Sequence, residues 1–211
     1  MAVRARVKIT TPISEIEGWI LFEFRKQVDA RLRRASPVIA RQVGRLLEKK
    51  IRSTPHIASL LHGQLRQDFG LSESDAAQYT EEIISAVKSH TSTTLKFKTD
   101  KKGNRAVSIV VKVAPDGFIS AIAPIGAYQS YGGQVSWLSW LLTKGTEVAV
   151  DGFRVFNGDD LTGSRAGDAL MIKGGVFRVD PEFAGTENDN FILEAVRGSL
   201  VEISEIIRTY I

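Results

Sequence analysis

The chain has 211 residues, of which 43% are apolar and none is cysteine, so it can form a core but no disulfide bond or thiolate metal site. It has no run of about 18 apolar residues and no apolar signal segment, so we expect a soluble intracellular protein without a membrane span. The formal charge of +4 is uneven, because residues 1–53 hold 13 Lys and Arg against 5 Asp and Glu, and residues 54–211 hold 15 against 19.

The basic N-terminal part allows two interpretations. It can be a surface for nucleic acid or for an acidic partner. It can also be the solvated side of a helix that is rich in lysine and arginine. The basic residues are not interleaved with aromatic residues of a nucleic-acid motif, so both interpretations stay open.

The first predicted elements are a strand and a long helix. Residues 3–10 alternate between apolar and polar side chains, which predicts a strand. Ser14 and Glu17 have the spacing of a capping box, so a helix should begin there. Ser36 and Pro37 predict either a kink or a fresh start, after which helix should continue over residues 37–52.

Short helices should cover residues 55–89. Gly70 is placed to end the first of them, and Ser72 to begin the next. The three histidines of the chain lie in and just after this region, without the spacing of a metal site, so we interpret them as structural or exposed: His56, His62 and His90.

The pattern then changes to strands. Residues 91–99 and 105–113 predict a hairpin, residues 118–122 a third strand, and residues 128–133 a loop. Residues 137–146 follow as one short, very apolar helix, which holds two of the three tryptophans and ends at a glycine.

The last third of the chain predicts a strand at 147–156, a polar loop at 157–168 and a hairpin that turns at Gly174 and Gly175. The loop should be mobile or ordered by a partner. Residues 188–190 can cap a final helix, whose inner row is expected to be Phe191 or Ile192, Ala195, Leu200, Ile203 and Ile207.

No motif in the sequence predicts catalysis. Gly158 and Gly163 are spaced like the first two glycines of a phosphate-binding loop, but Ser164 and Arg165 stand where Lys and Ser or Thr are required. The same loop lacks the ligand pattern of a calcium site, and Ser164 is not in a nucleophile elbow. We therefore predict that the chain is not an enzyme and has no catalytic residue, no cofactor and no metal.

These elements predict an α+β fold in a single domain over residues 1–211. A small antiparallel sheet should be packed by a long N-terminal helix, a short apolar central helix and a C-terminal helix. The three parts are a basic strand and helix at 1–53, short helices at 54–90, and the sheet with the last helix at 91–211.

Several short motifs occur in an order that resembles a known family. They are Thr54-Pro55, residues 63–66, 69–71, 137–146, 164–167 and 181–192. Over about residues 54–196 the chain is similar to the neck and tail-completion proteins, or head–tail connectors, of tailed bacteriophages. The basic N-terminal part lies outside this similarity.

The resemblance implies a structural virion protein without a membrane, assembled in the host cytoplasm as a ring of six or twelve copies at the head–tail junction. Its partners would be the portal or connector and the tail proteins. One alternative is a tail terminator that caps the tail tube or sheath. An alternative of another class is a basic DNA-binding accessory module.

Two groups of residues are candidates for contacts in such a ring. Aromatic side chains concentrate interface energy, so the candidates for the subunit interface are Trp137, Trp140, Phe183 and Phe191, for which the alternative is a place in the core. The candidates for a surface that faces DNA or an acidic protein are Arg31, Arg33, Arg34, Arg41 and Arg45.

Overall fold

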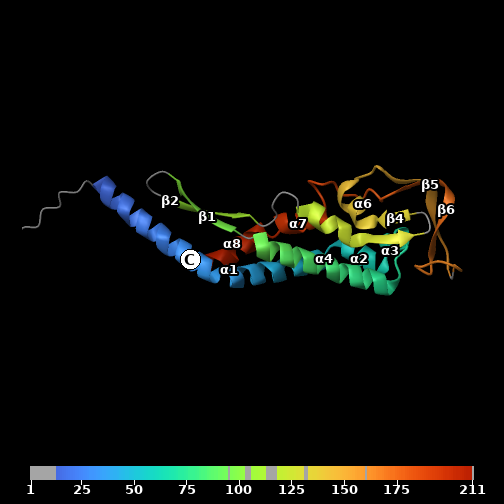
Figure 1. Cartoon of the computed structure of the whole chain (residues 1–211), viewed down its shortest axis with the longest axis horizontal. Coiled ribbons are helices and arrows are strands. Elements are labelled where there is room, and N and C mark those ends of the chain that lie inside the picture. Colours follow the sequence, from blue (N-terminus) through green and yellow to red (C-terminus); the bar gives the residue numbers. More distant parts are fainter. Residues whose placement is uncertain are drawn as a thin grey trace, which may run out of the picture.

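The computed structural model describes residues 13–94, 96–102, 106–112, 118–130, 133–159 and 161–210. Figure 1 shows an elongated molecule built along two long helices, α1 (Ile13–Arg52) and α4 (Glu73–Thr94). The helices are antiparallel, because Arg52 at the end of α1 pairs with Glu81, and Glu48, one turn earlier, pairs with Lys88. The strand predicted at residues 3–10 lies outside the described residues.

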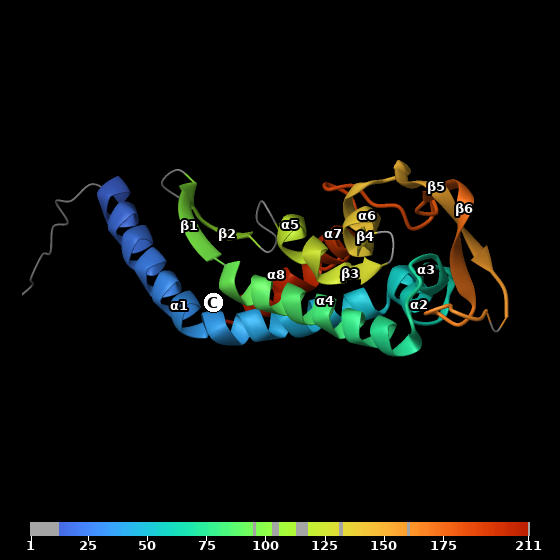
Figure 2. The same cartoon turned by 45° about the vertical axis from the view of Figure 1, so that its right-hand side comes forward.

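Helix α1 continues through Pro37 and bends along its length (Figure 2). A proline inside a helix removes one backbone hydrogen bond and bends the helix, so the structure has a kink and not a second helix. Beyond the proline, a row of side chains at four-residue spacing is completely buried: Ile39, Val43, Leu47 and Ile51. Each such side chain stabilises the fold by roughly 1.5–3 kcal/mol.

Two short helices connect α1 to α4: α2 (Pro55–His62) and α3 (Gln64–Asp68). Thr54 caps α2, since its hydroxyl accepts a hydrogen bond from the Ile57 amide. Gly70 ends the segment with φ of +60°, a conformation that favours glycine. The predicted stop at this glycine is confirmed.

Helix α4 is longer than the sequence predicts. It contains residues 91–94, which the pattern assigns to a strand. Thr91 is fully buried in this helix, and its hydroxyl is satisfied because it donates a hydrogen bond to the carbonyl of Val87 at 2.7 Å. The strand prediction is wrong there and correct for the remainder, which forms β1 (Lys96–Lys102).

Within the described residues, the strands form three separate antiparallel pairs and not one sheet. β1 pairs with β2 (Ala106–Lys112), which confirms the predicted hairpin. β3 (Ala127–Ser130) pairs with β4 (Gly133–Ser136), where the sequence predicts a loop. Residues 118–122 form helix α5 (Phe118–Ile122) and not a strand, because three apolar side chains at helical spacing are buried together: Phe118, Ile119 and Ile122.

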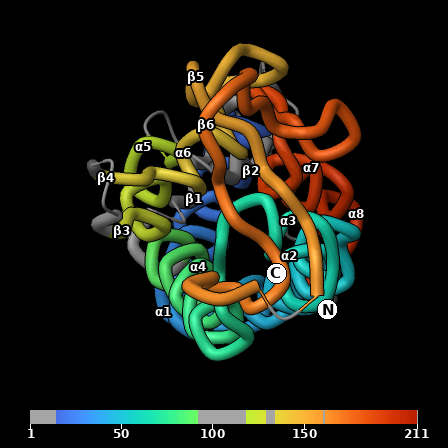
Figure 3. The backbone as a smooth tube through the Cα atoms, turned by 90° about the vertical axis from the view of Figure 1, so that its right-hand side faces the viewer, coloured from blue at the N-terminus to red at the C-terminus, as the bar shows by residue number. Residues whose placement is uncertain are grey.

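The third pair is a long ribbon made of β5 (Val148–Asn157) and β6 (Ala169–Arg178), which runs lengthwise across the front of the molecule in Figure 3. The predicted hairpin at Gly174 and Gly175 is wrong, because β6 runs through both glycines as one strand. The pairing shifts there, since Asp151 pairs with Val176 while Phe153 pairs with Lys173. Both glycines have positive φ, so they form an irregularity in the ladder rather than a turn.

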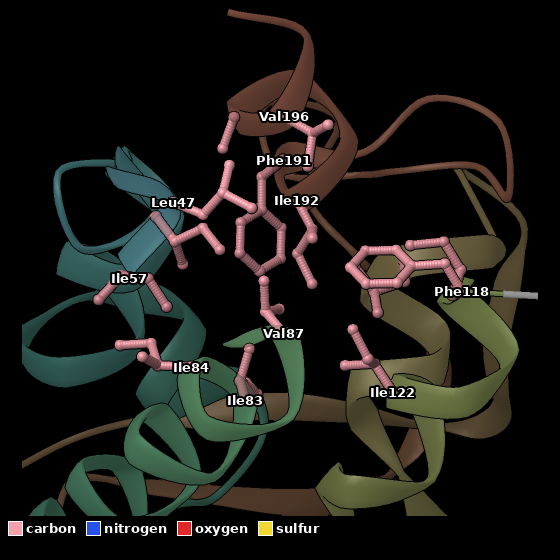
Figure 4. Close-up of a cluster of buried hydrophobic side chains, with 14 of the residues drawn as sticks. Leu47, Ile57, Ile83, Ile84, Val87, Phe118, Ile122, Phe191, Ile192 and Val196 are labelled. Carbon is pink, nitrogen blue, oxygen red and sulfur yellow. The ribbon is translucent and has the colours of Figure 1, made fainter. Parts of the chain in front are cut away.

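The core lies where α1, α2, α4, α5 and α7 (Phe191–Arg197) meet. Figure 4 shows side chains from all five helices gathered in one buried cluster, among them Leu47, Ile57, Val87, Ile122 and Phe191. The same buried cluster extends from Val28 to Ile207. One core therefore holds the two long helices to the C-terminal part of the chain.

The predicted apolar helix is present as α6 (Trp137–Thr143) and is buried in this core. The 3-10 turn η1 (Ala123–Gly126) packs tightly against it. A Cβ atom at Gly126 would lie only 2.4 Å from the Leu138 Cβ atom. Glycine is therefore required at this contact.

The last helix is capped as predicted, since the Asn190 side chain accepts a hydrogen bond from the Leu193 amide. It is split into α7 and α8 (Leu200–Arg208) at Gly198 and Ser199. Leu200 is exposed, which corrects its predicted place in the inner row. The α+β class is confirmed, and none of the described helices is long and apolar enough to cross a membrane.

Candidate interaction surfaces

The first part of α1 extends beyond the packed body of the molecule (Figure 2). We call residues 13–27 the arm, because the side chains of residues 15–27 are exposed or half-buried and Val28 is the first one that is buried. Four large apolar side chains of the arm are more than half exposed: Trp19 (65%), Ile20 (63%), Phe22 (59%) and Phe24 (52%). Contiguous exposed apolar groups of this size mark interaction surfaces.

These four side chains surround most of the arm. Ile20 and Phe24 continue, at four-residue spacing, the row that becomes buried at Val28. Trp19 and Phe22 are three residues apart and lie on the other side of the helix. A helix that carries apolar side chains on several sides must be contacted by other protein surfaces on several sides to remove them from water.

The basic residues begin inside the arm, at Arg25 and Lys26, and continue beyond it. Residues 25–34 contain five Lys and Arg against one Asp. All five arginines selected from the sequence are exposed. Within the part of the chain that the structure describes, no carboxylate forms an ion pair with four of them: Arg33, Arg34, Arg41 and Arg45.

Two of these arginines border a groove between α1 and α4. The groove has a volume of about 700 Å³, and Arg41, Arg45 and Lys88 supply its cations. The other residues that line the groove are mostly small. At Gly44, a Cβ atom would lie 3.6 Å from the Lys88 Cγ atom, so the Lys88 side chain packs close to this glycine. Glu48 neutralises Lys88 at 2.7 Å. The two arginines, one helical turn apart, could hold an anionic group there.

The four aromatic candidates for a subunit interface lie inside the chain. Trp137, Phe183 and Phe191 are buried, and Trp140 is half-buried against the core. The Trp137 ring lies 5.2 Å from the Phe69 ring between centroids. These positions favour the core alternative over a seam between subunits.

Histidine 56 belongs to the same aromatic group. Its ring stacks on Phe191 at 4.7 Å and meets the edge of Phe183 at 5.3 Å. Burial lowers the pKa of His56. The His90 ring lies 4.8 Å from that of Phe118, and no cluster of three His, Asp or Glu residues suited to a metal ion occurs among the described residues.

The polar loop at residues 158–168, which we call the strap, is fixed to the body. Arg66 of α3 pairs with Asp168 and donates a second hydrogen bond to the Ala166 carbonyl at 3.0 Å. Arg165 pairs with Asp75 at 3.1 Å and lies over the Tyr128 ring, 4.4 Å from its centre. A hydrogen bond from Gln67, together with the charge of Arg66, lowers the pKa of Asp168. Burial opposes the shift of Asp75, but hydrogen bonds from Ser72 and the charge of Arg165 lower its pKa. The strap therefore has its partners within its own chain, which corrects the expectation of a mobile or partner-ordered loop.

The ribbon carries the second group of exposed apolar side chains. Four of them are between 38% and 48% exposed: Val148, Phe156, Met171 and Val176. The ribbon packs against α3, at the end of the molecule opposite the arm (Figure 1). The arm and the ribbon are thus the two ends at which apolar surface is left uncovered.

Sequence reasoning did not single out the arm or the ribbon as surfaces. A signal was present in the arm, because Trp19 and Phe22 lie off the row of apolar residues that becomes buried. The sequence of the ribbon contains no such signal. Its apolar and polar residues alternate, as they do in any strand that has one buried face.

One half-buried carboxyl group stands out in the body. The pKa of Asp68 is raised to about 6, mainly by burial, while a hydrogen bond from Gln64 opposes the shift and the charge of Asp180 adds to it. Asp68 is therefore a local cost to stability at neutral pH. It lies in α3, beside the ribbon, and not in the basic groove.

We compared the chain with protein-family models, with curated proteins and with solved structures, and none of the three comparisons finds a match.

Proposed function

We propose that this chain is a structural protein of a tailed-bacteriophage virion, which forms a ring at the neck and joins the head to the tail. The observation that carries the proposal is the arm, a helix that projects from a packed body with four large apolar side chains in water. Leaving this surface uncovered costs free energy, at roughly 25 cal/mol per Å² of apolar area. A subunit of an assembly recovers this free energy when a neighbour covers the arm.

The resemblance supplies the biological setting. Its motifs fall mainly in the body, including α6 and the segment that leads into α7. The partners in this setting are the portal or connector on one side and tail proteins on the other. A tail terminator would use the same kind of ring and differ only in the neighbour that it contacts.

The test is assembly of the full chain. Light scattering and electron microscopy of the purified protein, alone and mixed with the portal protein encoded beside it, should reveal a ring of six or twelve copies. A chain that remains monomeric in both conditions, at every concentration, would contradict the proposal. Portal, capsid and tail genes on either side of its gene would support it independently.

A second candidate function is contact with DNA, and a specific observation favours it. Arg34, Arg41 and Arg45 are spaced by seven and four residues, so they lie along one face of α1. Their guanidinium groups have no ion-pair partner among the described residues. Such a row can neutralise successive phosphates without reading bases.

DNA retention at increasing salt tests this second candidate. Retention should be weak, independent of sequence and lost as salt increases. Replacing Arg34, Arg41 and Arg45 by Ala should reduce the slope of log K against log salt by about 2.7, at 0.9 for each phosphate contact. Replacement of three other exposed cations by Ala, at Arg154, Lys173 and Arg208, is the matched control and should leave the slope unchanged. If the wild-type protein retains no DNA even at low salt, the basic face serves an acidic protein instead.

A further inference from the structure

The groove between α1 and α4 and the arm have opposite shapes. Six of the nine residues that line the groove are no larger than proline: Ser36, Pro37, Ala40, Gly44, Ser85 and Ser89. Its volume of about 700 Å³ lies within the range of clefts that hold a ligand, roughly 300–1,000 Å³. The arm presents large side chains instead, since Trp19 and Phe22 project into solvent. Large side chains on one helix pack well where the facing helices carry small ones.

The charges along α1 are separated in the same way. Residues 13–24 hold three Glu and no Lys or Arg, and residues 25–45 hold seven Lys and Arg against one Asp. Within the part of the chain that the structure describes, Glu15, Arg41 and Arg45 form no ion pair. The end of the arm is therefore acidic and the border of the groove is basic. Opposite charge on two surfaces favours their association and sets its orientation.

The carboxylates and the rings of the arm share one side of the helix. Glu15, Trp19 and Glu23 follow one another at four-residue spacing, so a carboxylate lies one turn before the indole and another one turn after it. Arg41 and Arg45 have the same spacing at the border of the groove. A helix laid in the groove with this side inward brings the indole to the small residues and the carboxylates to the arginines.

The arm of one chain cannot enter its own groove. Both surfaces lie on α1, which is helical from Ile13 to Arg52, and its bend is far from a reversal of direction (Figure 2). The helix rises about 32 Å between Trp19 and Ala40, at 1.5 Å per residue. An arm that fills the groove must therefore belong to another copy of the chain.

We propose that the arm of one copy occupies the groove between α1 and α4 of the next copy. This inference rests on the proposed ring and names the two surfaces that would join its subunits. The contact is heterologous, because two different surfaces of the chain meet, and repeated contacts of this kind close into a ring when the rotation between copies allows it. Trp19 and Phe22 are the anchors, and Arg41 and Arg45 serve an acidic protein surface rather than DNA.

Complementation between two defective variants tests the contact. The arm variant carries Trp19→Ser and Phe22→Ser, and the groove variant carries Ser85→Trp, which fills the groove from an exposed position. In sedimentation velocity, each alone should associate at least about tenfold more weakly than the wild type. Mixed at equal amounts, they should form a 1:1 dimer, because one intact arm and one intact groove remain in the mixture.

Ser204→Trp is the matched control for the groove variant, because it places the same ring at an exposed serine of α8. This control should associate as the wild type does. If arms paired with arms, or with the ribbon, the groove variant would also associate like the wild type and the inference would be wrong. A wild-type chain that stays monomeric at every concentration would contradict it as well.

Exchange of the charges is a second test, which leaves the apolar side chains in place. The pair Glu15→Arg and Glu23→Arg should weaken association, because like charges would then face each other. The pair Arg41→Glu and Arg45→Glu should do the same. A chain that carries all four substitutions should associate again, since each arginine of the arm then has a carboxylate opposite. No recovery in this chain would show that these charges do not meet.

Cross-linking locates the contact, since the chain has no cysteine of its own. Glu23→Cys protein mixed with Ser85→Cys protein should give a mixed dimer with a short bismaleimide. Val201→Cys is the matched control, because this position is 70% exposed but lies on α8. Equal cross-linking to both positions, or none at the highest concentration, would overturn the inference.

The outcome separates this inference from the proposed function. If rings form but the groove variant assembles as well as the wild type, the ring stands and the contact between arm and groove is wrong. If the mixed dimer forms but the wild type yields no closed ring with or without the portal protein, the contact stands and the neck function is wrong.

Discussion

The arm and the body share one helix, yet they differ in everything that stabilises a folded chain. In the second half of α1, the row that includes Val43 and Leu47 is fully buried under α4 and the C-terminal helices. In the arm, Ile20 and Phe24 continue the same four-residue spacing and remain in water. A row of apolar side chains thus shows that a helix must pack against another surface. It does not show whether that surface belongs to the same chain or to another one.

The comparison also separates two kinds of tryptophan. Trp137 is completely buried in the body, in contact with rings from α4 and from the segment after α3. Trp19 projects from the arm into solvent. The same side chain therefore contributes to folding in one place and is available for association in the other.

The largest expected effect comes from removing these two rings. Trp137→Ala should lower the free energy of unfolding by about 3–5 kcal/mol, because it leaves a cavity in the core. Trp19→Ala is the matched control and should change it by less than about 0.5 kcal/mol in the monomer. Urea denaturation followed by fluorescence measures both. A large loss of stability for the Trp19 variant would mean that the arm is part of the folded body.

An intermediate effect is expected where the strap is held to the body. Arg66→Ala should cost about 2 kcal/mol, since the mostly buried guanidinium satisfies both Asp168 and the Ala166 carbonyl. Arg165→Ala removes an exposed pair and a cation–π contact, and should cost about 0.5–1 kcal/mol. Limited proteolysis within residues 158–168 should increase strongly for the first variant only. Equal protection of the strap in both variants would show that Arg66 does not hold it.

The smallest expected effect concerns the half-buried carboxyl group of Asp68, and here the substitution should increase stability rather than lower it. The raised pKa of Asp68 means that, between its ordinary value of 3.8 and about 6, the folded chain keeps a proton that the unfolded chain has released. Stability due to this group therefore falls as pH rises through that window and stays lower at pH 7. Asp68→Asn should raise the free energy of unfolding at pH 7 by about 1 kcal/mol.

Thermal unfolding from pH 4 to pH 8 measures this effect. The stabilisation by Asp68→Asn should grow between about pH 4 and 6 and then become constant. His56 has a lowered pKa and gives the opposite slope, but it is present in both proteins, so the difference between the curves isolates Asp68. Asp159→Asn, at an exposed position, is the control. A difference that does not depend on pH would assign the effect to packing instead.

Much of the fold could be predicted from local chemistry. The α1 row, the stop at Gly70, the pairing of β1 with β2 and the cap at Asn190 all depend on residues that are close in the sequence. The errors occur where distant contacts decide. Residues 118–122 fit a strand or a helix equally well as a short apolar run, and packing against α4 selects the helix.

The sequence could not reveal the strap contacts. Arg66 and Asp168 are separated by about one hundred residues in the chain, and a charge pattern carries no information about which pairs meet in space. The polar composition of the loop therefore predicted mobility, whereas α3 and α4 supply the partners that hold it. The candidate interface residues changed for the same reason, because aromatic residues are suited equally to a core and to a contact.

By itself, the sequence determined the class of the fold, the capped starts of several helices and the basic character of its N-terminal quarter. These follow from side-chain periodicity, capping residues and composition, which act over short distances along the chain. Only the tertiary structure decided which apolar residues are covered. Trp137 is enclosed because α4, η1 and the segment after α3 pack around the start of α6. Trp19 is 65% exposed because it lies on the part of α1 that projects from the helices of the body.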